Sequence, residues 1–368
     1  MQLTITGFQK EIGEKVYGFW GHIHIKQFDF NYNYAIGDKP INKNQNFYPF
    51  IDTIPEIRNI QVYANKAGII KTKEDIEGIV LKGIGSDYNW EFFKQYLIEG
   101  DTIQIKDGKK NNNIILSSKT AQRLKLKLGD DVVVYFIQKP ARVRKFKLKG
   151  IYNTGLEEFD KIYALVDIAH IQKLNGWTDN QVGGFQVFLN SLSSLDEVLD
   201  YIYYNIIDLS LNAKSTREIN PNIFDWLDLQ SINQQVILIL MILVAAINLI
   251  TTLLILILER TNMIGILKAI GASNIAIQNI FLYNILIIIS MGLFFGNIIG
   301  IGLSLIQKHF NLISLPEASY YLTTVPVNLD PITIIALNVG VLIINALILF
   351  VPSLLVRRIS PIKAIRFD

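Results

Sequence analysis

Two histidines near the start of the chain have a spacing that could bind a metal ion. His22 and His24 lie two residues apart, so in a strand both imidazoles would face the same side. A metal site needs further ligands, and the remaining histidines are His170 and His309, far along the chain. We therefore expect no metal here and interpret the pair as solvent-facing side chains of a strand.

A second group of polar residues is acidic. Glu157, Glu158 and Asp160 could supply a carboxylate pair for acid–base chemistry, but a loop of solvated acids explains them better. The chain contains no Gly-x-x-x-x-Gly-Lys-Ser/Thr phosphate loop and no cysteine. No set of nucleophile, base and orienting group can be assembled. We expect that the chain is not an enzyme and holds no cofactor of its own.

Three uncharged stretches in the last third are long enough to cross a bilayer, namely residues 236–258, 275–307 and 332–356. A helix rises about 1.5 Å per residue, so about 20 apolar residues span the hydrocarbon core. The amides and hydroxyls inside these stretches should bond to neighbouring helices rather than line a substrate pathway. Glycines at four-residue spacing in the second stretch would let another helix approach closely.

The connecting segments orient these spans. Residues 259–274 and 357–368 together hold six Lys and Arg, whereas 308–331 holds one. The positive-inside rule places the first two segments in the cytoplasm and the third outside. Residues 25–230 must then lie outside as well, yet residues 1–24 contain no apolar stretch that could direct their export. We therefore expect that a first transmembrane helix, ahead of residue 1, is missing from this chain.

Residues 25–230 read as a water-soluble domain. Acidic and basic residues balance there, so the net charge of +3 comes from the last third, and no basic face suggests a nucleic-acid partner. Strands are predicted at residues 59–71, with a turn at Gly68, and at 75–85. Residues 111–137 and 161–176 repeat a strand-then-helix order. The sequence predicts an α+β exterior domain followed by an all-α membrane domain of three transmembrane helices.

One short, partly basic segment separates the first two spans, with the sequence ERTNMIGILKAIGAS at residues 259–273. Read as a helix, it places Ile266 and Ile270 on one face and Met263 and Leu267 on an adjacent one. In the cytoplasm, such apolar helix faces would fit a groove of a partner protein. The alternative is an amphipathic turn lying on the lipid surface.

Two residues mark the end of this predicted helix. Gly271 provides a stop, because glycine readily adopts the left-handed conformation that ends helices. Ser273 can cap the helix that follows, since a serine oxygen accepts a bond from a free amide in the first turn.

The segment resembles the cytoplasmic loop of FtsX-like ABC transporter permeases, with the approximate pattern R-x-x-E-I-G-I-L-[KR]-x-[IL/M]-G-A. Met263 stands where that family often has an acid. The tail PSLLVRRISPIKAIRFD resembles the closing motif of the family, and LSSKTAQRLKLKLGDDVVV resembles the MacB-type periplasmic core. The stretch GFQKEIGEKVYGFWGHI is similar to the segment after the first span in the lipoprotein-releasing (LolC/LolE) branch.

This resemblance implies a four-span permease in the bacterial inner membrane, with one large periplasmic domain. Two such subunits, identical or different, would pair with two copies of a separate cytoplasmic ATPase that binds ATP and Mg²⁺. A coupling helix would dock on that ATPase, and movement rather than a channel would act on a lipoprotein cargo. The coupling residues would be Arg260, Met263, Ile264, Gly265, Ile266, Leu267, Lys268, Ala269, Ile270, Gly271 and Ala272.

In the lipoprotein-releasing branch, one permease carries a hairpin that recruits a periplasmic carrier. The corresponding region here is a short basic hairpin at residues 138–147, with Gln138, Lys139, Pro140, Arg142 and Arg144 as its candidate binding residues. Two other readings within the resemblance stay open. One is a MacB-like permease that exports peptides or small toxic molecules, and the other is an FtsX-like signalling subunit that activates an exterior hydrolase.

Overall fold

The computed structural model describes residues 1–353 apart from 29–37, 50, 52, 74 and 107. The chain divides into two compact units. The sheet unit comprises Lys10–Asp225 and Leu315–Thr323, and the helical unit comprises Met1–Gln9, Trp226–Ser314 and Thr324–Asp368. Helix α1 (Gln2–Trp20) and helix α8 (Pro221–Glu259) each contribute residues to both units.

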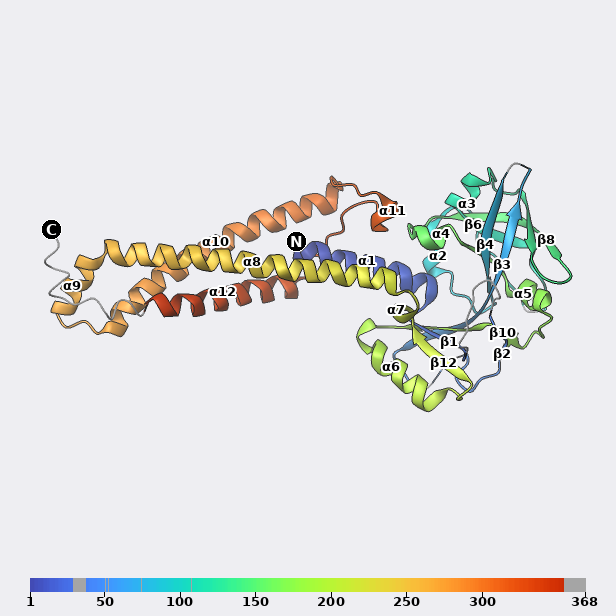
Figure 1. The fold of residues 1–368 in the computed structure, drawn as a ribbon, viewed down its shortest axis with the longest axis horizontal. Helices are drawn as coiled ribbons and strands as arrows, with labels where there is room; N and C mark the ends of the chain where they lie inside the picture. The colour runs from blue at the N-terminus through green and yellow to red at the C-terminus, as the bar shows by residue number, and fades with distance from the viewer. Residues whose placement is uncertain (29–37, 50, 52, 74, 107, 354–368) are drawn as a thin grey trace. The chain divides into compact units, whose positions relative to one another are not determined.

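The sheet unit is built on a ten-stranded mixed sheet (Figure 1). Its strands are β1 (Ile23–Gln27), β3 (Ile57–Lys71), β4 (Ile76–Ile84), β5 (Leu97–Gly100), β6 (Asn113–Ser117), β7 (Asp131–Phe136), β8 (Arg142–Tyr152), β9 (Tyr163–Asp167), β11 (Gly184–Leu189) and β12 (Leu211–Ser215). The order is β12-β1-β11-β3-β4-β9-β6-β8-β5, and β7 pairs with β3 and β8. Strand β4 runs parallel to β9 and β6 runs parallel to β8, while the other recorded pairs are antiparallel.

Short helices connect these strands, as the strand-then-helix patterns predict. They are α2 (Glu91–Tyr96), α3 (Ser118–Arg123), α4 (Glu157–Asp160), α5 (Ile168–Asn175), α6 (Leu195–Tyr201) and α7 (Thr216–Ile219). A separate two-stranded sheet joins β2 (Ile41–Asn42) to β10 (Gln181–Val182). Mixed pairing with short interspersed helices confirms the α+β prediction for this part of the chain.

The turn predicted at Gly68 is wrong, because β3 continues through this residue to Lys71. Gly68 instead lies where β7 joins β3. A Cβ added at Gly68 would lie 2.7 Å from Cγ1 of Val134, so a side chain here would collide with the neighbouring strand. Glycine is therefore needed here because two strands lie close together, and not because the chain reverses direction.

The two faces of the central sheet differ in character. Alternate residues of β1, β3, β4 and β11, such as Ile23, Val62, Leu81 and Val187, face a large apolar core with α5. The opposite face carries a row of polar side chains that are buried as well, namely His24, Gln186, Gln61, Asn65 and Lys82. The register places His24 opposite Gln186, Gln186 opposite Gln61, and Asn65 opposite Lys82. The last turn of α1 lies against this polar face, where Lys82 contacts Phe19 and Trp20.

Helix α5 packs closely on β4 at Gly83, and this contact gives a stability prediction. A Cβ at Gly83 would lie 2.8 Å from both Cα of Ile168 and Cδ1 of Ile171. Gly83→Ala should therefore lower the free energy of unfolding of the sheet unit by about 1–3 kcal/mol, the usual cost of overpacking a core. Gly78→Ala in the same strand is the control, because its Cβ would meet nothing within 4 Å. Equal denaturation midpoints for the two variants would contradict the prediction.

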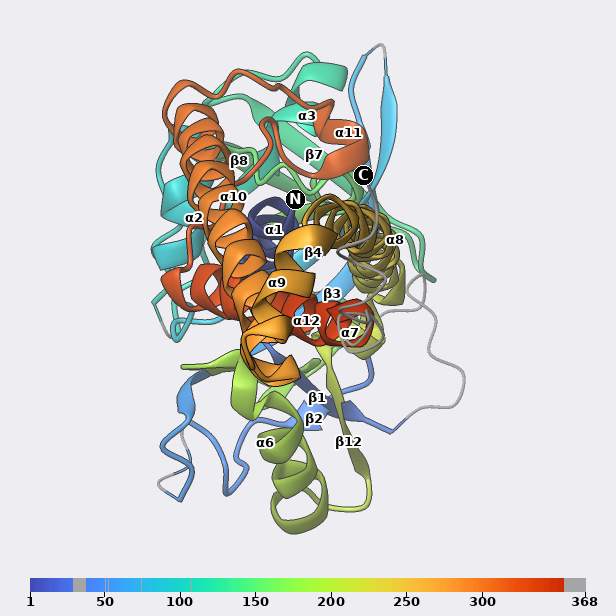
Figure 2. The same cartoon turned by 90° about the vertical axis from the view of Figure 1, so that its left-hand side faces the viewer.

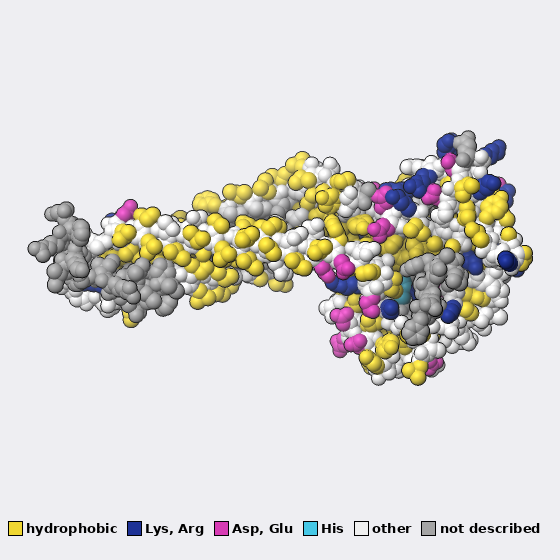
Figure 3. All heavy atoms as spheres, viewed as in Figure 1, with side chains coloured by type: hydrophobic (Ala, Val, Ile, Leu, Met, Phe, Trp, Pro, Cys, Tyr) yellow, Lys and Arg dark blue, Asp and Glu magenta, His cyan; other side chains and the backbone are white. Residues whose placement is uncertain are grey.

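The helical unit contains three long apolar helices, α8, α10 (Asn274–Phe310) and α12 (Pro331–Ser353), together with the short helix α9 (Thr261–Ala269). Each long helix has the length and composition of a membrane span, and the three predicted spans fall on them. Residues 354–356 of the third span and the tail 357–368 lie outside the described residues. In Figure 3 the visible face of this unit is mostly hydrophobic, whereas charged side chains gather on the sheet unit.

Polar side chains inside these helices bond locally. Asn297 of α10 and Asn338 of α12 exchange two hydrogen bonds, 2.6 and 3.1 Å long, which confirms that amides link neighbouring helices. The hydroxyls of Thr251 and Thr252 each bond to the carbonyl four residues earlier. The glycines of α10 remain open, since a Cβ at Gly292, Gly296, Gly300 or Gly302 would meet nothing within 4 Å.

Candidate functional site

Helix α9 turns the chain from α8 into α10 and ends as the sequence predicts (Figures 1 and 2). Gly271 follows the helix with a φ of 95°. Its amide donates to the carbonyl of Lys268 over 3.1 Å, and the amide of Ala272 donates to the carbonyl of Leu267 over 2.9 Å. These two bonds form a Schellman motif, which confirms Gly271 as the stop.

The remaining predicted coupling residues lie at the two ends of α9. Arg260 occupies the N-cap position and is exposed. Ala269 is the last helical residue and is exposed, while Ala272 packs against the apolar cluster described below. Ser273 Oγ accepts a hydrogen bond of 3.2 Å from the amide of Ala276 and caps α10, which confirms its predicted role.

The apolar side chains of α9 divide between two faces. Ile264 is fully buried and Leu267 is partly buried, both in a cluster formed with α8, α10 and α12. Gly265 is buried on the same side. The other large side chains point outward, with exposed fractions of 36% for Met263, 52% for Ile266 and 76% for Ile270. The inward face therefore holds α9 against the long helices, and among the described residues the large apolar side chains of the other face are exposed. The inward cluster comprises Leu253, Ile257, Ile264, Ile277, Phe281, Ile285, Ile289 and Leu349.

The predicted basic hairpin is formed by β7 and β8, joined through residues 137–141. Nε2 of Gln138 donates to the carbonyl of Leu174, and Nη1 of Arg142 donates to the carbonyl of Lys173, so the base of the hairpin is bonded to the end of α5. Ile137 at the start of the turn is 85% exposed. Lys139 and Pro140 lie in the turn, and Arg144 bonds to the main chain of its own strand.

The expectation that both early histidines face solvent is wrong. His24 is 2% exposed, with Nδ1 3.4 Å from the hydroxyl of Tyr63, and Nδ1 of His22 accepts a bond of 3.1 Å from the amide of Leu189. Strand β1 lies between β11 and β12 rather than at a sheet edge, which buries His24, while His22 just before the strand is partly buried. Burial lowers the pKa of His22 to about 4 and that of His24 well below its ordinary value, so both rings are neutral near pH 7. Within the described part of the chain, no three His, Asp or Glu side chains are placed to hold a metal ion.

The solvated-loop interpretation of the acidic group is wrong for Asp160, which is fully buried. Its carboxylate accepts bonds from the hydroxyl of Thr154 over 2.7 Å, the amide of Thr154 over 3.0 Å and the amide of Gly155 over 3.2 Å. Burial raises the pKa of this carboxyl to about 6. Its main-chain carbonyl accepts bonds from Ser117 and Thr120, so the residue ties its loop to α3. This arrangement is structural and offers no reacting group.

The connection between α10 and α12 contributes Leu315–Thr323, including α11 (Glu317–Tyr320), to the sheet unit. Nζ of Lys15 in α1 donates to the carbonyl of Tyr321 over 3.1 Å. The hydroxyl of Tyr321 donates to the carboxylate of Glu158 over 3.3 Å. These contacts require the connection and the sheet unit to lie on the same side of a membrane, in agreement with the orientation drawn from the charges.

A functional candidate that the sequence patterns did not reveal is Lys82 in β4. Its side chain is fully buried, and Nζ donates a 2.6 Å bond to the carbonyl of Phe19 at the end of α1. In the sequence, Lys82 appears as a lysine inside the apolar run that forms β4. That pattern does not tell whether the lysine is buried or exposed.

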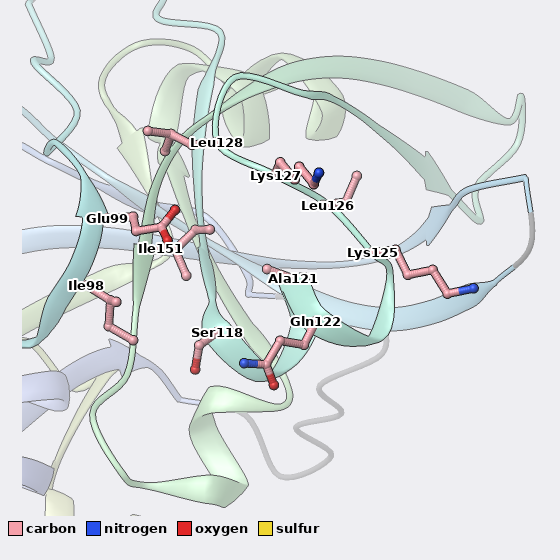
Figure 4. Close-up of a pocket in the computed structure, with 10 residues that line it drawn as sticks. All are labelled: Ile98, Glu99, Ser118, Ala121, Gln122, Lys125, Leu126, Lys127, Leu128 and Ile151. Atoms are coloured by element: carbon pink, nitrogen blue, oxygen red, sulfur yellow. The ribbon is translucent and has the colours of Figure 1, made fainter.

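A hollow of about 620 Å³ lies beside the edge strand β5 (Figure 4). Ile98, Leu126, Leu128 and Ile151 give it apolar walls, and Lys125 points away from the other lining side chains. Glu99 is the one carboxylate among its ten lining residues. The lining therefore contains neither a carboxylate pair for acid–base chemistry nor a set of metal ligands.

Comparison with known proteins finds similarity to membrane permeases. Residues 235–361 match the family FtsX-like permease C-terminal. The chain is 23% identical over 382 residues to the lipoprotein-releasing system transmembrane protein LolC of Xylella fastidiosa, an alignment that covers 99% of this chain and 89% of that protein. It is 21% identical over 320 residues to the corresponding LolE of Haemophilus influenzae, covering 82% of this chain and 72% of LolE.

Among solved structures, the periplasmic region of MacB from Actinobacillus actinomycetemcomitans aligns with 58% of this chain and 98% of its own length, at 14% identity. The TM-score of that alignment is 0.37, which does not by itself establish a common fold. The two sequence matches cover more of the chain. The family match covers the three apolar helices and α9, and the LolC alignment continues through the sheet unit. The C-terminal part of this chain, residues 235–361, therefore matches the FtsX-like permease family, and nearly the whole chain is similar to LolC.

Proposed function

We propose that this chain is the permease subunit of an ABC transporter that releases lipoproteins from the inner membrane of a bacterium. In this proposal the sheet unit is periplasmic, and a separate cytoplasmic ATPase binds ATP and Mg²⁺. The observation that carries the proposal is the outward apolar face of α9, together with relatives named for a lipoprotein-releasing system. A second permease subunit, identical or different, would complete the membrane part.

The outward face of α9 suits a protein groove better than a lipid surface. Met263 and Ile266 of the nine-residue helix, with Ile270 at its C-cap, are large apolar side chains in a segment that lies between two spans. The inward side of the same helix is packed on α8, α10 and α12. A force applied to the outward face would therefore move the long helices instead of only bending a loop.

The polar groups of the long helices support a mechanical role. The described spans hold amides and hydroxyls that bond within a helix or between α10 and α12, as Asn297 and Asn338 do. No Asp, Glu, His, Lys or Arg lies within residues 236–258 or 275–307. Intramembrane charges usually mark the pathways of ions and polar substrates, so transmission of movement to the periplasmic side is the better interpretation.

The β7–β8 hairpin is the candidate site for a soluble periplasmic carrier, and its exposed apolar tip gives a test. Ile137→Asp should reduce transfer of a reporter lipoprotein to a soluble carrier about tenfold, because it removes one apolar anchor from the contact. Ile76→Asp is the matched control, since Ile76 is a similarly exposed isoleucine (64%) elsewhere on the sheet unit. Equal transfer by both variants would mean that the hairpin does not bind the carrier.

The experiment that tests the whole proposal is reconstitution. The full chain is purified with the ATPase that accompanies it and placed in liposomes containing a triacylated reporter lipoprotein. ATP-dependent release of the reporter supports the proposal. Export that needs an adaptor and an outer-membrane channel would favour the MacB-like alternative. ATP-dependent activation of an exterior hydrolase without release would favour the FtsX-like signalling alternative.

A further inference from the structure

The end of helix α1 is held by a lysine that has no contact with solvent. Lys82 lies at 0% exposure, and its ammonium nitrogen is 2.6 Å from the carbonyl oxygen of Phe19. The same nitrogen lies 4.8 Å from the ring centroid of Trp20, 4.9 Å from that of Phe19 and 5.8 Å from that of Tyr88. Three aromatic faces and one helix-terminal carbonyl thus surround the charge.

A lysine in this position is energetically expensive, which makes its presence informative. Lysine is almost never fully buried unless it is paired, and no Asp or Glu among the described residues forms an ion pair with Lys82. Burial lowers the pKa of its ammonium to about 7. A methionine would fill the same volume without that cost, so packing alone does not explain the residue.

The polar face around Lys82 contains few other bonds that could hold α1. Buried side-chain atoms without a hydrogen-bond partner include Nε1 of Trp20, Nε2 of His24, both amide atoms of Asn65 and both amide atoms of Gln186. The main apolar core lies on the other face of the sheet, and on this face Phe19 and Trp20 pack against Phe159 and Tyr163. Beside that aromatic packing, the hydrogen bond from Lys82 Nζ to the carbonyl of Phe19 is a directional contact between β4 and the last turn of α1.

The chain just beyond this turn is fixed to a second helix. Gly21 follows α1 with a φ of 81°, and its carbonyl accepts a 2.6 Å bond from the hydroxyl of Thr216. Thr216 opens α7, five residues before α8 begins at Pro221. Helices α1 and α8 both extend from the sheet unit into the helical unit. Their ends on the sheet therefore meet at one joint, and Lys82 connects that joint to the sheet itself.

We propose that Lys82 is the positioning residue that fastens the end of α1 to strand β4, so that a displacement of α1 moves the central sheet. This inference rests on the proposed function, in which movement of the membrane helices does work on the periplasmic side. The ammonium suits this role because a cation beside the C-terminal carbonyls of a helix interacts favourably with the helix dipole as well as with the carbonyl that it bonds.

The first test measures the joint itself by hydrogen–deuterium exchange on the full chain in lipid nanodiscs. Lys82→Met should speed exchange in residues 16–22, at the end of α1 and just beyond it, by about tenfold, because a hydrogen bond to the last turn of the helix is lost. Exchange in β3 should stay unchanged. Lys66→Met is the matched control, since Lys66 is a half-buried lysine on the adjacent strand. Unchanged exchange in residues 16–22, or faster exchange throughout the sheet unit, would overturn the proposal.

A double-mutant cycle separates the bond from general packing. Trp20→Leu removes one aromatic face from the ammonium, and its effect on exchange should be smaller in the Lys82→Met background than in the wild type. Additive effects would mean that the two residues act independently, which contradicts a shared role at the joint.

The second test asks whether the joint transmits movement. In the reconstituted complex, Lys82→Met should retain ATP hydrolysis while release of the triacylated reporter falls about tenfold. Release equal to that of wild type would overturn the transmission role. If the wild-type complex itself releases no reporter, the proposed function fails, and the exchange measurement still decides whether Lys82 holds α1.

Discussion

Ile266→Asp is expected to release the ATPase subunit from this permease while the chain stays folded. Ile266 lies on the outward face of α9, where its side chain is 52% exposed and makes no part of the inward cluster. A carboxylate placed in an apolar groove of a partner would be buried without a counter-charge, which costs about 2–5 kcal/mol of binding free energy. At about 1.4 kcal/mol per tenfold, a micromolar complex would dissociate under ordinary conditions.

The measurement is the amount of ATPase that co-purifies with each variant from the membrane. Ile270→Asp should behave like Ile266→Asp, because the two residues share the outward face. Leu267→Asp is a poorer probe, since Leu267 packs against the inward cluster and its replacement would disturb the helical unit. Ile137→Asp on the hairpin is the control and should leave ATPase recovery unchanged. Normal recovery with Ile266→Asp would show that α9 lies on the lipid surface instead.

The stability of the sheet unit is expected to rise with pH above neutrality, and Lys82 supplies this dependence. Its pKa is about 7 in the folded protein and about 10.5 when unfolded. Between these values the unfolded chain binds one more proton than the folded chain, so raising the pH favours the fold. The slope approaches about 1.4 kcal/mol per pH unit, and the gain from pH 7 to pH 9 is about 2 kcal/mol.

Lys82→Met should remove this gain and make the sheet unit at least as stable as wild type at pH 7, because the buried charge is gone. The check is denaturant unfolding of the full chain in detergent at pH 7, 8 and 9, followed by tryptophan fluorescence. The comparison with Lys82→Met cancels the contributions of other lysines such as Lys26, whose pKa is also lowered by burial. A variant that keeps the wild-type pH dependence would contradict the assignment. A variant that is more stable yet fails to release the reporter would show that Lys82 serves movement rather than stability.

Two regions of this protein therefore have complementary parts in the proposed mechanism. At α9, an apolar outward face is fixed to the long helices by Ile264 and its neighbours. At the end of α1, an ammonium inside an aromatic enclosure bonds the helix to a strand. The first would receive force from the ATPase, and the second would pass it to the sheet. The variants of Ile266 and Lys82 test these steps separately, because only the first should change ATPase recovery.

The sequence by itself determined the features that depend on local pattern. Long uncharged runs can only be accommodated as apolar helices, and they became α8, α10 and α12. The stop at Gly271 and the cap at Ser273 followed from the preferences of single residues at helix ends. Strands β3 and β4 followed from residue type and the turn between them, although Gly68 looked like a turn because its close contact with β7 involves residues far along the chain.

Only the tertiary structure decided which side chains are buried and what they contact. Helical spacing placed Leu267 and Ile266 on neighbouring faces of α9, but the packing of α8, α10 and α12 determined that Ile266 faces outward. His24, Asp160 and Lys82 are polar residues for which local sequence favours solvent, yet all three are buried. The end of α1 packs against His24 and Lys82, and Asp160 bonds to Thr154 and to the start of α3. Burial depends on elements that meet from distant parts of the chain, so it raises the pKa of Asp160 and lowers that of Lys82 in ways that no local pattern records.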